Sequence, residues 1–132
     1  MNSKNLIVDL RNNTGGGDKS SKQFYQLLKR YKGSIYLLLN YGTVSNAEQF
    51  ILKLMKKNNV TLLGERTRGM ITYGRNYSRD KISPSKMYRI HFSDMKDQWK
   101  QYLPYEVFGI SPDIPLESDS DWIEKTIEII RK

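Results

Sequence analysis

The sequence predicts an α/β fold with a parallel sheet, and the order of two kinds of segment carries this prediction. Short apolar runs typical of buried strands alternate with segments whose apolar residues recur at helical spacing. Strands that are joined through helices over such distances pair in parallel, through right-handed crossovers. We therefore expect the first three strands to share one parallel sheet.

The first predicted strand is the apolar run LIVDL, residues 6–10, which leads into the polar, glycine-rich loop RNNTGGGD. The following segment, SSKQFYQLLKRYKG, has its apolar residues on one helical face, and Gly33 supplies a stop. These apolar residues are Phe24, Leu27, Leu28 and Tyr31. A helix is therefore expected directly after the first strand.

The next strand and helix repeat this order. SIYLLLNYG, residues 34–42, is a second apolar run, and the segment after Ser45 has an apolar stripe at helical spacing. The stripe consists of Ala47, Phe50, Ile51, Leu54 and Met55. NNVTLLGE, residues 58–65, predicts a third strand.

The pattern changes after Glu65, where short strand-like pieces replace the longer units. MITYG and MYRIHF are joined by a polar loop around Pro84, and GISPDIPL has two prolines that exclude a continuous helix. The chain closes with SDSDWIEKTIEIIRK, which opens on Asp and Ser caps and predicts a final helix. That helix has Ile123, Ile127 and Ile130 at helical spacing.

Length and composition set the broad class. The 132 residues fit one domain, 1–132, and no apolar stretch approaches the roughly 20 residues of a membrane-spanning helix. The chain has no cysteine, so disulfides and thiolate metal sites are excluded. Since the N-terminus shows no secretory signal and the absence of cysteine fits either redox compartment, the localisation stays unknown.

The net charge of +8 is unevenly distributed along the chain. The first 105 residues carry 19 bases against seven acids, whereas the remainder, from Glu106 onward, has three bases against seven acids. A basic chain can bind nucleic acid or an anionic membrane. The bases are scattered and form no nucleic-acid motif, so a solvated basic surface is the favoured interpretation.

Two short segments could carry chemistry. Gly15 to Gly17 follow a strand and could form a plain turn or offer backbone amides to a reacting carbonyl, and they lack the spacing of a nucleotide site. Ser45 starts a helix, where it could be a nucleophile or an ordinary cap. With Glu48 it has the S-x-x-E spacing of a capping box, which needs no chemistry.

A serine nucleophile needs a base, and the sequence offers few. His91 is the only histidine and lies in a strand-like segment, where a structural role is the more common one. Arg66 and Arg68 stay protonated and cannot accept a proton. A single histidine and carboxylates without EF-hand spacing predict neither a metal site nor a cofactor.

Four segments together resemble one enzyme family. NLIVDLRNNTGGG, IYLLLNYGTVSNAEQF, VTLLGERTRG and EVFGISPDI have the order and spacing found in the C-terminal processing (tail-specific) serine proteases, the group that includes the tricorn protease core. The similarity extends from about Leu6 to Ile130. It implies a ClpP/crotonase-like β/α spiral core, with the N-terminal part of that core absent from this chain.

The resemblance also implies roles for individual residues. Ser45 aligns with the family nucleophile, and the amide of Asn46 with that of Gly15 or Gly16 matches the oxyanion hole. Glu48 and Thr67 align with polar residues that line family active sites. The substrate would be a peptide or an unfolded protein.

The chain departs from the family at the general base. The tail-specific branch has a lysine where GERTRGM places Met70, and a thioether accepts no proton. The tricorn-like branch uses a histidine from the N-terminal half together with a glutamate that Glu106 matches. No residue here matches that histidine, so the chain is expected to be a fragment, one half of a split protein or a degenerate remnant.

The leading hypothesis is therefore the C-terminal part of a tricorn-like serine endopeptidase, with Ser45 and Glu106 in this chain and the histidine from a second chain or a missing half. The isolated chain is expected to have little or no activity. The alternative is a non-catalytic peptide-binding or scaffold remnant of the same fold.

Overall fold

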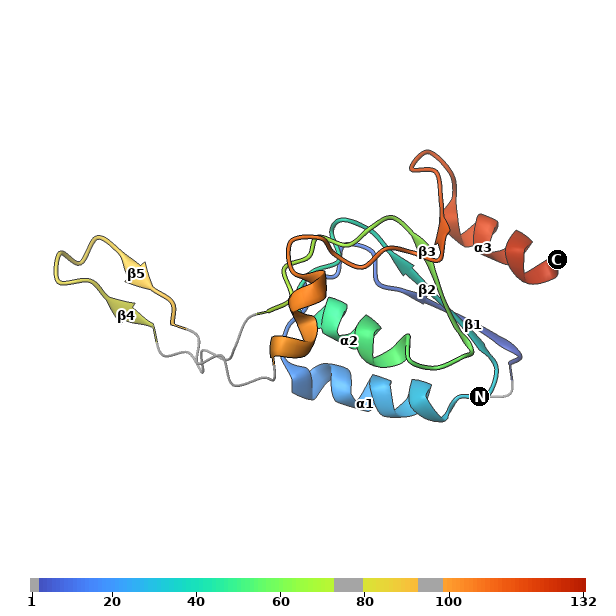
Figure 1. The fold of residues 1–132 in the computed structure, drawn as a ribbon, viewed down its shortest axis with the longest axis horizontal. Coiled ribbons are helices and arrows are strands. Elements are labelled where there is room, and N and C mark those ends of the chain that lie inside the picture. Colours follow the sequence, from blue (N-terminus) through green and yellow to red (C-terminus); the bar gives the residue numbers. More distant parts are fainter. Residues whose placement is uncertain (1–2, 73–79, 93–98) are drawn as a thin grey trace.

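The computed structural model describes residues 3–72, 80–92 and 99–132. Four strands form one parallel sheet in the order β1-β2-β3-β6 (Figure 1). The strands are β1 (Asn5–Asp9), β2 (Ser34–Leu39), β3 (Val60–Gly64) and β6 (Ile114–Pro115). The α/β class and the parallel pairing of the three predicted strands are confirmed.

Helices cover both faces of this sheet (Figure 1). Leu37 and Leu39 of β2 point to the face covered by α1 (Asp18–Arg30) and α2 (Asn46–Leu54). Leu38, between them, points to the opposite face and packs with Trp122 of α3 (Trp122–Arg131). This alternation is the period-two geometry of a strand, and it explains why β2 has no polar position between Ile35 and Leu39.

Helix α1 departs from its predicted packing. Leu28 is buried as expected, but Phe24 and Leu27 are 64% and 62% exposed. Tyr31 lies beyond the helix, which ends at Arg30, three residues before Gly33, the predicted stop. The helix lies over β1, an end strand of the sheet, so that Phe24 and Leu27 border an open groove instead of a closed core.

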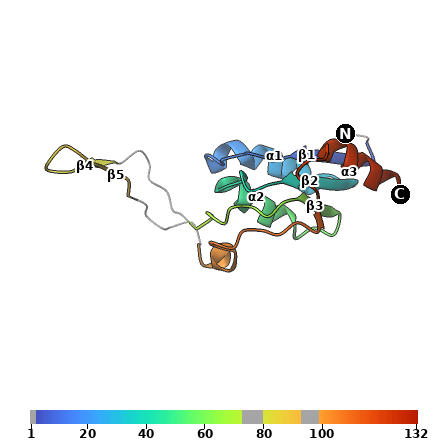
Figure 2. The same ribbon diagram turned by 90° about the horizontal axis from the view of Figure 1, so that it is seen from above.

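A separate antiparallel hairpin projects from the α/β body (Figures 1 and 2). It consists of β4 (Lys81–Ile82) and β5 (Arg89–Ile90), so the strand predicted in MYRIHF is limited to two residues. Of the strand predicted in MITYG, Met70 to Thr72 are not in a strand, and Tyr73 and Gly74 lie outside the described residues.

The return segment contains elements that the sequence pattern did not predict. A 3-10 helix, η1 (Trp99–Tyr105), precedes Glu106, and the proline-rich GISPDIPL contributes β6. Strand β6 is short because Pro115 lacks the amide hydrogen that a longer ladder needs. In the described part of the chain, no helix is long and apolar enough to cross a membrane.

Candidate active site

Ser45 lies at the turn between β2 and α2, where it is the N-cap residue of α2. Its backbone has φ 70° and ψ −128°, a conformation that residues other than glycine seldom adopt. The helix start that follows has unpaired amides and a partial positive charge. Such a strained position at a helix start is a frequent feature of functional sites.

The glycine loop after β1 lies directly against this turn. Gly15 has φ 91°, and a β-carbon added there would lie 2.7 Å from Ser45 Oγ and 2.8 Å from the Asn46 nitrogen. Val44 N–H also donates to the Asn13 carbonyl at 2.9 Å, which ties the loop to the turn. The structure thus places the glycine loop, Ser45 and Asn46 side by side.

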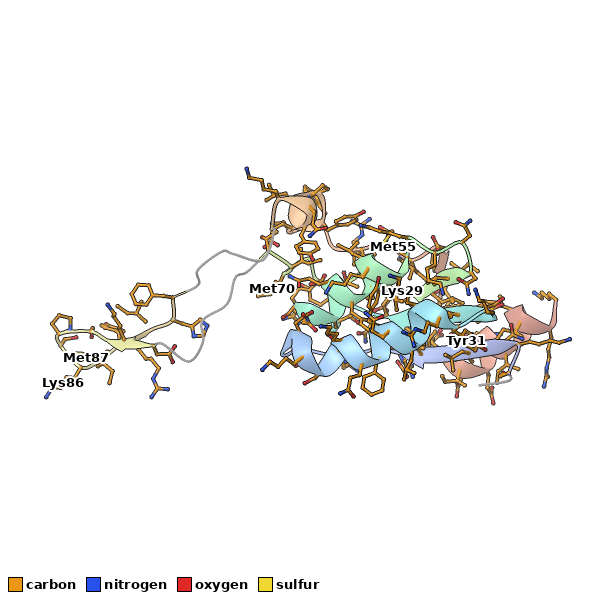
Figure 3. All side chains as sticks on the ribbon, turned by 90° about the horizontal axis from the view of Figure 1, so that it is seen from below. Lys29, Tyr31, Met55, Met70, Lys86 and Met87 are labelled. Carbon is orange, nitrogen blue, oxygen red and sulfur yellow. The ribbon has the colours of Figure 1, made fainter. Side chains whose placement is uncertain are left out.

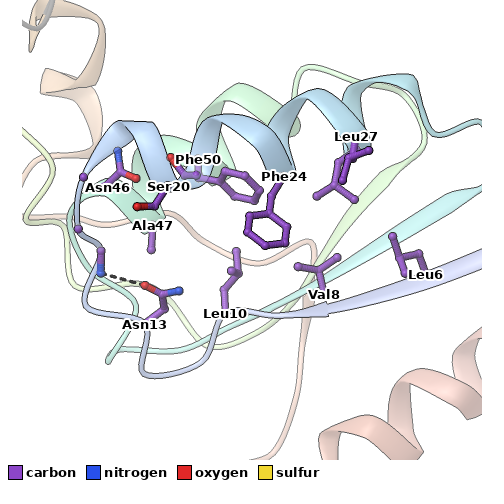
Figure 4. Close-up of a pocket in the computed structure, with 15 residues that line it drawn as sticks. Leu6, Val8, Leu10, Asn13, Ser20, Phe24, Leu27, Asn46, Ala47 and Phe50 are labelled. Atoms are coloured by element: carbon purple, nitrogen blue, oxygen red, sulfur yellow. Dashed lines mark hydrogen bonds between the residues drawn. The ribbon is translucent and has the colours of Figure 1, made fainter.

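The amides of this assembly differ in availability. Gly15 N–H donates to Asn13 Oδ1 at 2.9 Å, the bond drawn as a dashed line in Figure 4. Within the described residues, the amides of Gly16 and Asn46 have no protein acceptor. The Asn46 amide is one of the unpaired donors that every helix start leaves. An oxyanion bound here could therefore receive hydrogen bonds from Gly16 and Asn46 without breaking an existing bond.

Glu48 joins the start of α2 to the segment from Thr67 to Met70. Its fully buried carboxylate accepts from the Ser45 amide at 2.9 Å and from the Thr67 hydroxyl at 2.6 Å. It also accepts from the amides of Gly69 at 2.7 Å and Met70 at 3.1 Å. These four donors match the acceptor capacity of one carboxylate, so Glu48 fixes the turn that presents Ser45.

Thr67 continues this network toward the C-terminal segment. It is buried, and its hydroxyl oxygen also accepts from the Ile110 amide at 2.8 Å. The two residues predicted to line the active site, Glu48 and Thr67, therefore lie in the interior behind Ser45, where they support its backbone.

Glu106 follows η1 and binds the backbone just after Met70. Its Oε2 accepts from the amides of Ile71 at 2.9 Å and Thr72 at 2.7 Å. Partial burial raises the pKa of Glu106, but hydrogen bonds from the Thr72 side chain and from these two amides outweigh it, so the pKa is lowered overall. Glu106 is therefore a carboxylate at neutral pH.

Met70 and His91 are two residues that the sequence raises in connection with a general base. The Met70 amide shares Glu48 Oε2 with the Ser45 amide, so the two backbones are neighbours, and the Met70 side chain is 54% exposed. Figure 3 shows Met70 at the end of the body from which the hairpin extends. His91 follows β5 of the hairpin, which projects from the body (Figure 1), and bonds Asp80 through Nδ1 at 2.9 Å.

Three asparagines shape the site and were not identified from the sequence. Asn40 Oδ1 accepts from the amides of Asn12 at 2.9 Å and Gly42 at 3.0 Å, which links the loops after β1 and β2. Asn12 has φ 58°, and Asn13 holds Gly15. Asparagine tolerates a left-handed backbone and accepts hydrogen bonds from nearby amides. The sequence signal for these roles was therefore the presence of asparagine directly after two predicted strands.

The arrangement has the geometry that two parts of an acyl-transfer site require. Ser45 is the nucleophile candidate, and the Gly16 and Asn46 amides are oxyanion donors. His91 bonds Asp80 at the hairpin, and no cluster of three metal-ligating side chains occurs among the described residues.

Comparison with known proteins identifies similar sequences and folds. The sequence profile of Peptidase family S41 matches residues 18–116. No curated protein matches the chain significantly. Among solved structures, tricorn protease is similar with 21% identity and a TM-score of 0.65, over 98% of this chain and 15% of that one.

Two further solved structures share the fold. A lipoprotein from Streptococcus agalactiae has 17% identity and a TM-score of 0.62, over 97% of this chain and 54% of that one. The photosystem II D1 C-terminal processing protease has 16% identity and a TM-score of 0.56, over 88% of this chain and 35% of that one. The chain thus spans about half or less of each of these proteins.

Proposed function

Because the chain belongs to Peptidase family S41, we propose that it forms the nucleophile-bearing part of a serine endopeptidase core of the ClpP/crotonase-like type. The observation that carries the proposal is the close approach of Gly15 to Ser45 at the start of α2. A serine that only caps a helix does not require a glycine loop in contact with its hydroxyl. A serine nucleophile requires backbone amides close to its hydroxyl, and a glycine loop can supply them.

In the proposed reaction, Ser45 Oγ attacks the carbonyl carbon of a peptide bond. The tetrahedral oxyanion receives hydrogen bonds from the amides of Asn46 and Gly16. Gly16 is the better second donor because the Gly15 amide is already bound to Asn13. Glu48 and Thr67 hold the Ser45 backbone and do not contact the substrate.

The general base is proposed to be a histidine from a second chain or another part of a longer protein. It would take the Ser45 proton and pass it to the leaving amine. Glu106, ionised at neutral pH, would orient its ring. Without the base, several orders of magnitude of rate are lost, so this chain of residues 1–132 alone would be nearly inactive.

The experiment that tests the proposal is labelling with a fluorophosphonate, followed by peptide mapping. Ser45 should react faster than the chain's other serines, and Ser45→Ala should remove that label. Preferential labelling of any other serine, or uniform slow labelling of all, would contradict a nucleophile at Ser45. Robust peptide turnover that Ser45→Ala abolishes and His91→Ala retains would contradict the absent base.

A non-catalytic peptide-binding or scaffold function is the second candidate, and Met70 is the observation that favours it. The amides of Met70 and Ser45 both donate to Glu48 Oε2, so the two residues are neighbours. The thioether of Met70 nevertheless accepts no proton. This function predicts peptide binding with Ser45 no more reactive than an exposed serine. The labelling experiment therefore separates the two candidates.

A further inference from the structure

An exposed arginine, Arg68, lies beside the turn that carries Ser45. Its two neighbours in the chain, Thr67 and Gly69, are buried, and both donate to Glu48 Oε1, at 2.6 and 2.7 Å. The other oxygen of this carboxylate accepts from the Ser45 amide at 2.9 Å. One buried carboxylate therefore fixes the backbone of Arg68 relative to that of Ser45.

Arg68 and the glycine loop lie on opposite sides of this turn. The Arg68 amide donates to the Thr43 carbonyl at 3.3 Å, and the Val44 amide donates to the Asn13 carbonyl at 2.9 Å. The Thr43 carbonyl and the Val44 amide belong to one peptide unit, and in a trans peptide these two groups point in opposite directions. A peptide bound over Ser45 with its carbonyl oxygen toward the glycine loop would therefore have Arg68 on its other side.

The guanidinium of Arg68 is oriented but carries an uncompensated charge. Its Cζ lies 4.9 Å from the centroid of the Tyr41 ring, and Tyr41 is 61% exposed. In the described part of the chain, the Arg68 side chain makes no ion pair and donates no hydrogen bond. A cation–π contact restricts a guanidinium without supplying an acceptor, so its N–H donors are left for a ligand.

The segment that holds Arg68 follows an interior strand of the sheet. Strand β3 pairs with β2 on one side and with β6 on the other. The backbone amide of Arg68 is likewise satisfied, by Thr43. What this position offers is therefore one charged side chain beside the proposed nucleophile. The fork of N–H donors in a guanidinium matches the two oxygens of a carboxylate.

From this placement we propose that Arg68 determines specificity by binding a carboxylate of the substrate within about three residues, roughly 10 Å of extended chain, of the bond that Ser45 attacks. The inference rests on the proposed function and adds the chemical class that the site selects. The carboxylate has two possible sources, an aspartate or glutamate side chain or the C-terminus of a peptide.

The test measures binding, without turnover, to the Ser45→Ala chain by fluorescence anisotropy. Three labelled six-residue peptides differ only in their carboxylates. The first has a central aspartate and an amidated C-terminus, the second a central asparagine and an amidated C-terminus, and the third a central asparagine and a free C-terminus. At least one carboxylate peptide should bind about fivefold or more tightly than the second, and the one that does so identifies the source.

Two pairs of variants assign this preference to the guanidinium of Arg68. Arg68→Gln should abolish the preference, whereas Arg66→Gln should retain it, because Arg66 is equally charged and exposed but has no ring contact among the described residues. Tyr41→Ala should reduce the preference, since the guanidinium loses the ring that orients it. Tyr41→Phe keeps that ring and should retain the preference.

Three outcomes would overturn the proposal. Equal affinity for the three peptides would show that no carboxylate is selected. A preference that Arg68→Gln and Arg66→Gln reduce equally would reflect the positive charge of the chain alone, and one that persists in Arg68→Gln would place the carboxylate elsewhere. Fluorophosphonate labelling of the native chain tests the nucleophile separately. An unreactive Ser45 would therefore contradict the proposed function, whereas loss of the carboxylate preference alone would contradict only this inference.

Discussion

At the scale of single residues, the contact between Gly15 and Ser45 leaves no room for a side chain. Gly15→Ala would place a methyl group 2.7 Å from Ser45 Oγ at φ 91°. We expect it to lower the free energy of unfolding by about 1–3 kcal/mol and to slow fluorophosphonate labelling of Ser45. Urea unfolding and labelling rates measure the two effects.

Gly17 supplies the matched control for this substitution. It has φ −76°, and an added β-carbon would meet no atom within 4 Å. Gly17→Ala should therefore leave both stability and labelling close to those of the native chain. Equal effects at the two glycines would contradict a specific contact between Gly15 and Ser45.

The Asn46 amide can be removed without removing the residue. Asn46 is the first residue of α2, a position that tolerates proline, so Asn46→Pro deletes the proposed oxyanion donor. Loss of one such donor typically lowers the rate about 10²- to 10³-fold, and Asn46→Ala, which keeps the amide, controls for the lost side chain. Labelling rates that fall equally in both variants would assign the effect to the side chain, and circular dichroism checks that α2 persists.

Glu48 is the residue on which the geometry of the turn depends. Its carboxylate accepts four hydrogen bonds while fully buried, and Glu48→Gln would turn an amide NH₂ toward the donors that one carboxylate oxygen now satisfies. We expect a loss of about 3 kcal/mol in chemical denaturation, because buried donors are left unpaired. Glu124→Gln, at an exposed position of α3, should have little effect.

At the scale of elements, Glu106 joins the segment after η1 to the segment after β3, and this joint should depend on pH. The folded-state pKa of Glu106 lies below its ordinary value of 4.5, so the folded chain holds this proton less tightly than the unfolded chain. Its contribution to stability is complete above pH 4.5 and is lost as the pH falls through the folded-state pKa.

The measurement compares the native chain with Glu106→Gln by urea unfolding across this pH range. The native chain should be the more stable at neutral pH, and the difference should narrow on acidification below 4.5. The pKa of Asp9 is also lowered, mainly by its hydrogen bond to Arg11. Its pH-dependent contribution to stability is the same in both proteins, so it cancels from the difference between them. A difference that stays constant with pH would show that the Glu106 charge does not stabilise the joint.

Elements with a strong local pattern could be predicted from the sequence, whereas those set by distant contacts could not. The β2 run and the α2 stripe follow hydrophobic periodicity, and Ala47, Phe50, Ile51 and Leu54 are buried as expected. Strand β6 has only two residues and exists because β3 pairs with it. Phe24 has helical spacing, but its exposure depends on what lies beside β1.

The same distinction applies to the site. Ser45 and the glycine loop could be identified because each follows a strand, but their contact is a property of the sheet, which brings the ends of β1 and β2 together. Asn13 accepts from the Val44 amide through its carbonyl, and Glu48 accepts from the Thr67 hydroxyl, whereas the sequence signals only the local conformations of these two residues. Their supporting function therefore required the three-dimensional structure.

At the scale of the whole molecule, the proposed nucleophile and oxyanion donors belong to this chain, whereas the proposed general base does not. The sheet, the glycine loop and α2 hold the proposed nucleophile and the proposed oxyanion donors within the body. His91 follows β5 of the hairpin, where it bonds Asp80, and the similar solved structures are about twice as long as this chain or longer. The proposed function, in which the base comes from outside this chain, makes a distinct kinetic prediction.

Imidazole in solution should partly replace the missing base. Added to the native chain, it should raise the rate of fluorophosphonate labelling at Ser45, and the rate should increase with pH as imidazole loses its proton near pH ~6.5. A bulky buffer base of similar pKa is the control, because it cannot reach a serine held against the glycine loop, and Ser45→Ala should show no response. A rate that both bases raise equally would reflect pH or medium alone. A rate that neither base raises would show that Ser45 lacks more than a proton acceptor, and would favour the non-catalytic peptide-binding function.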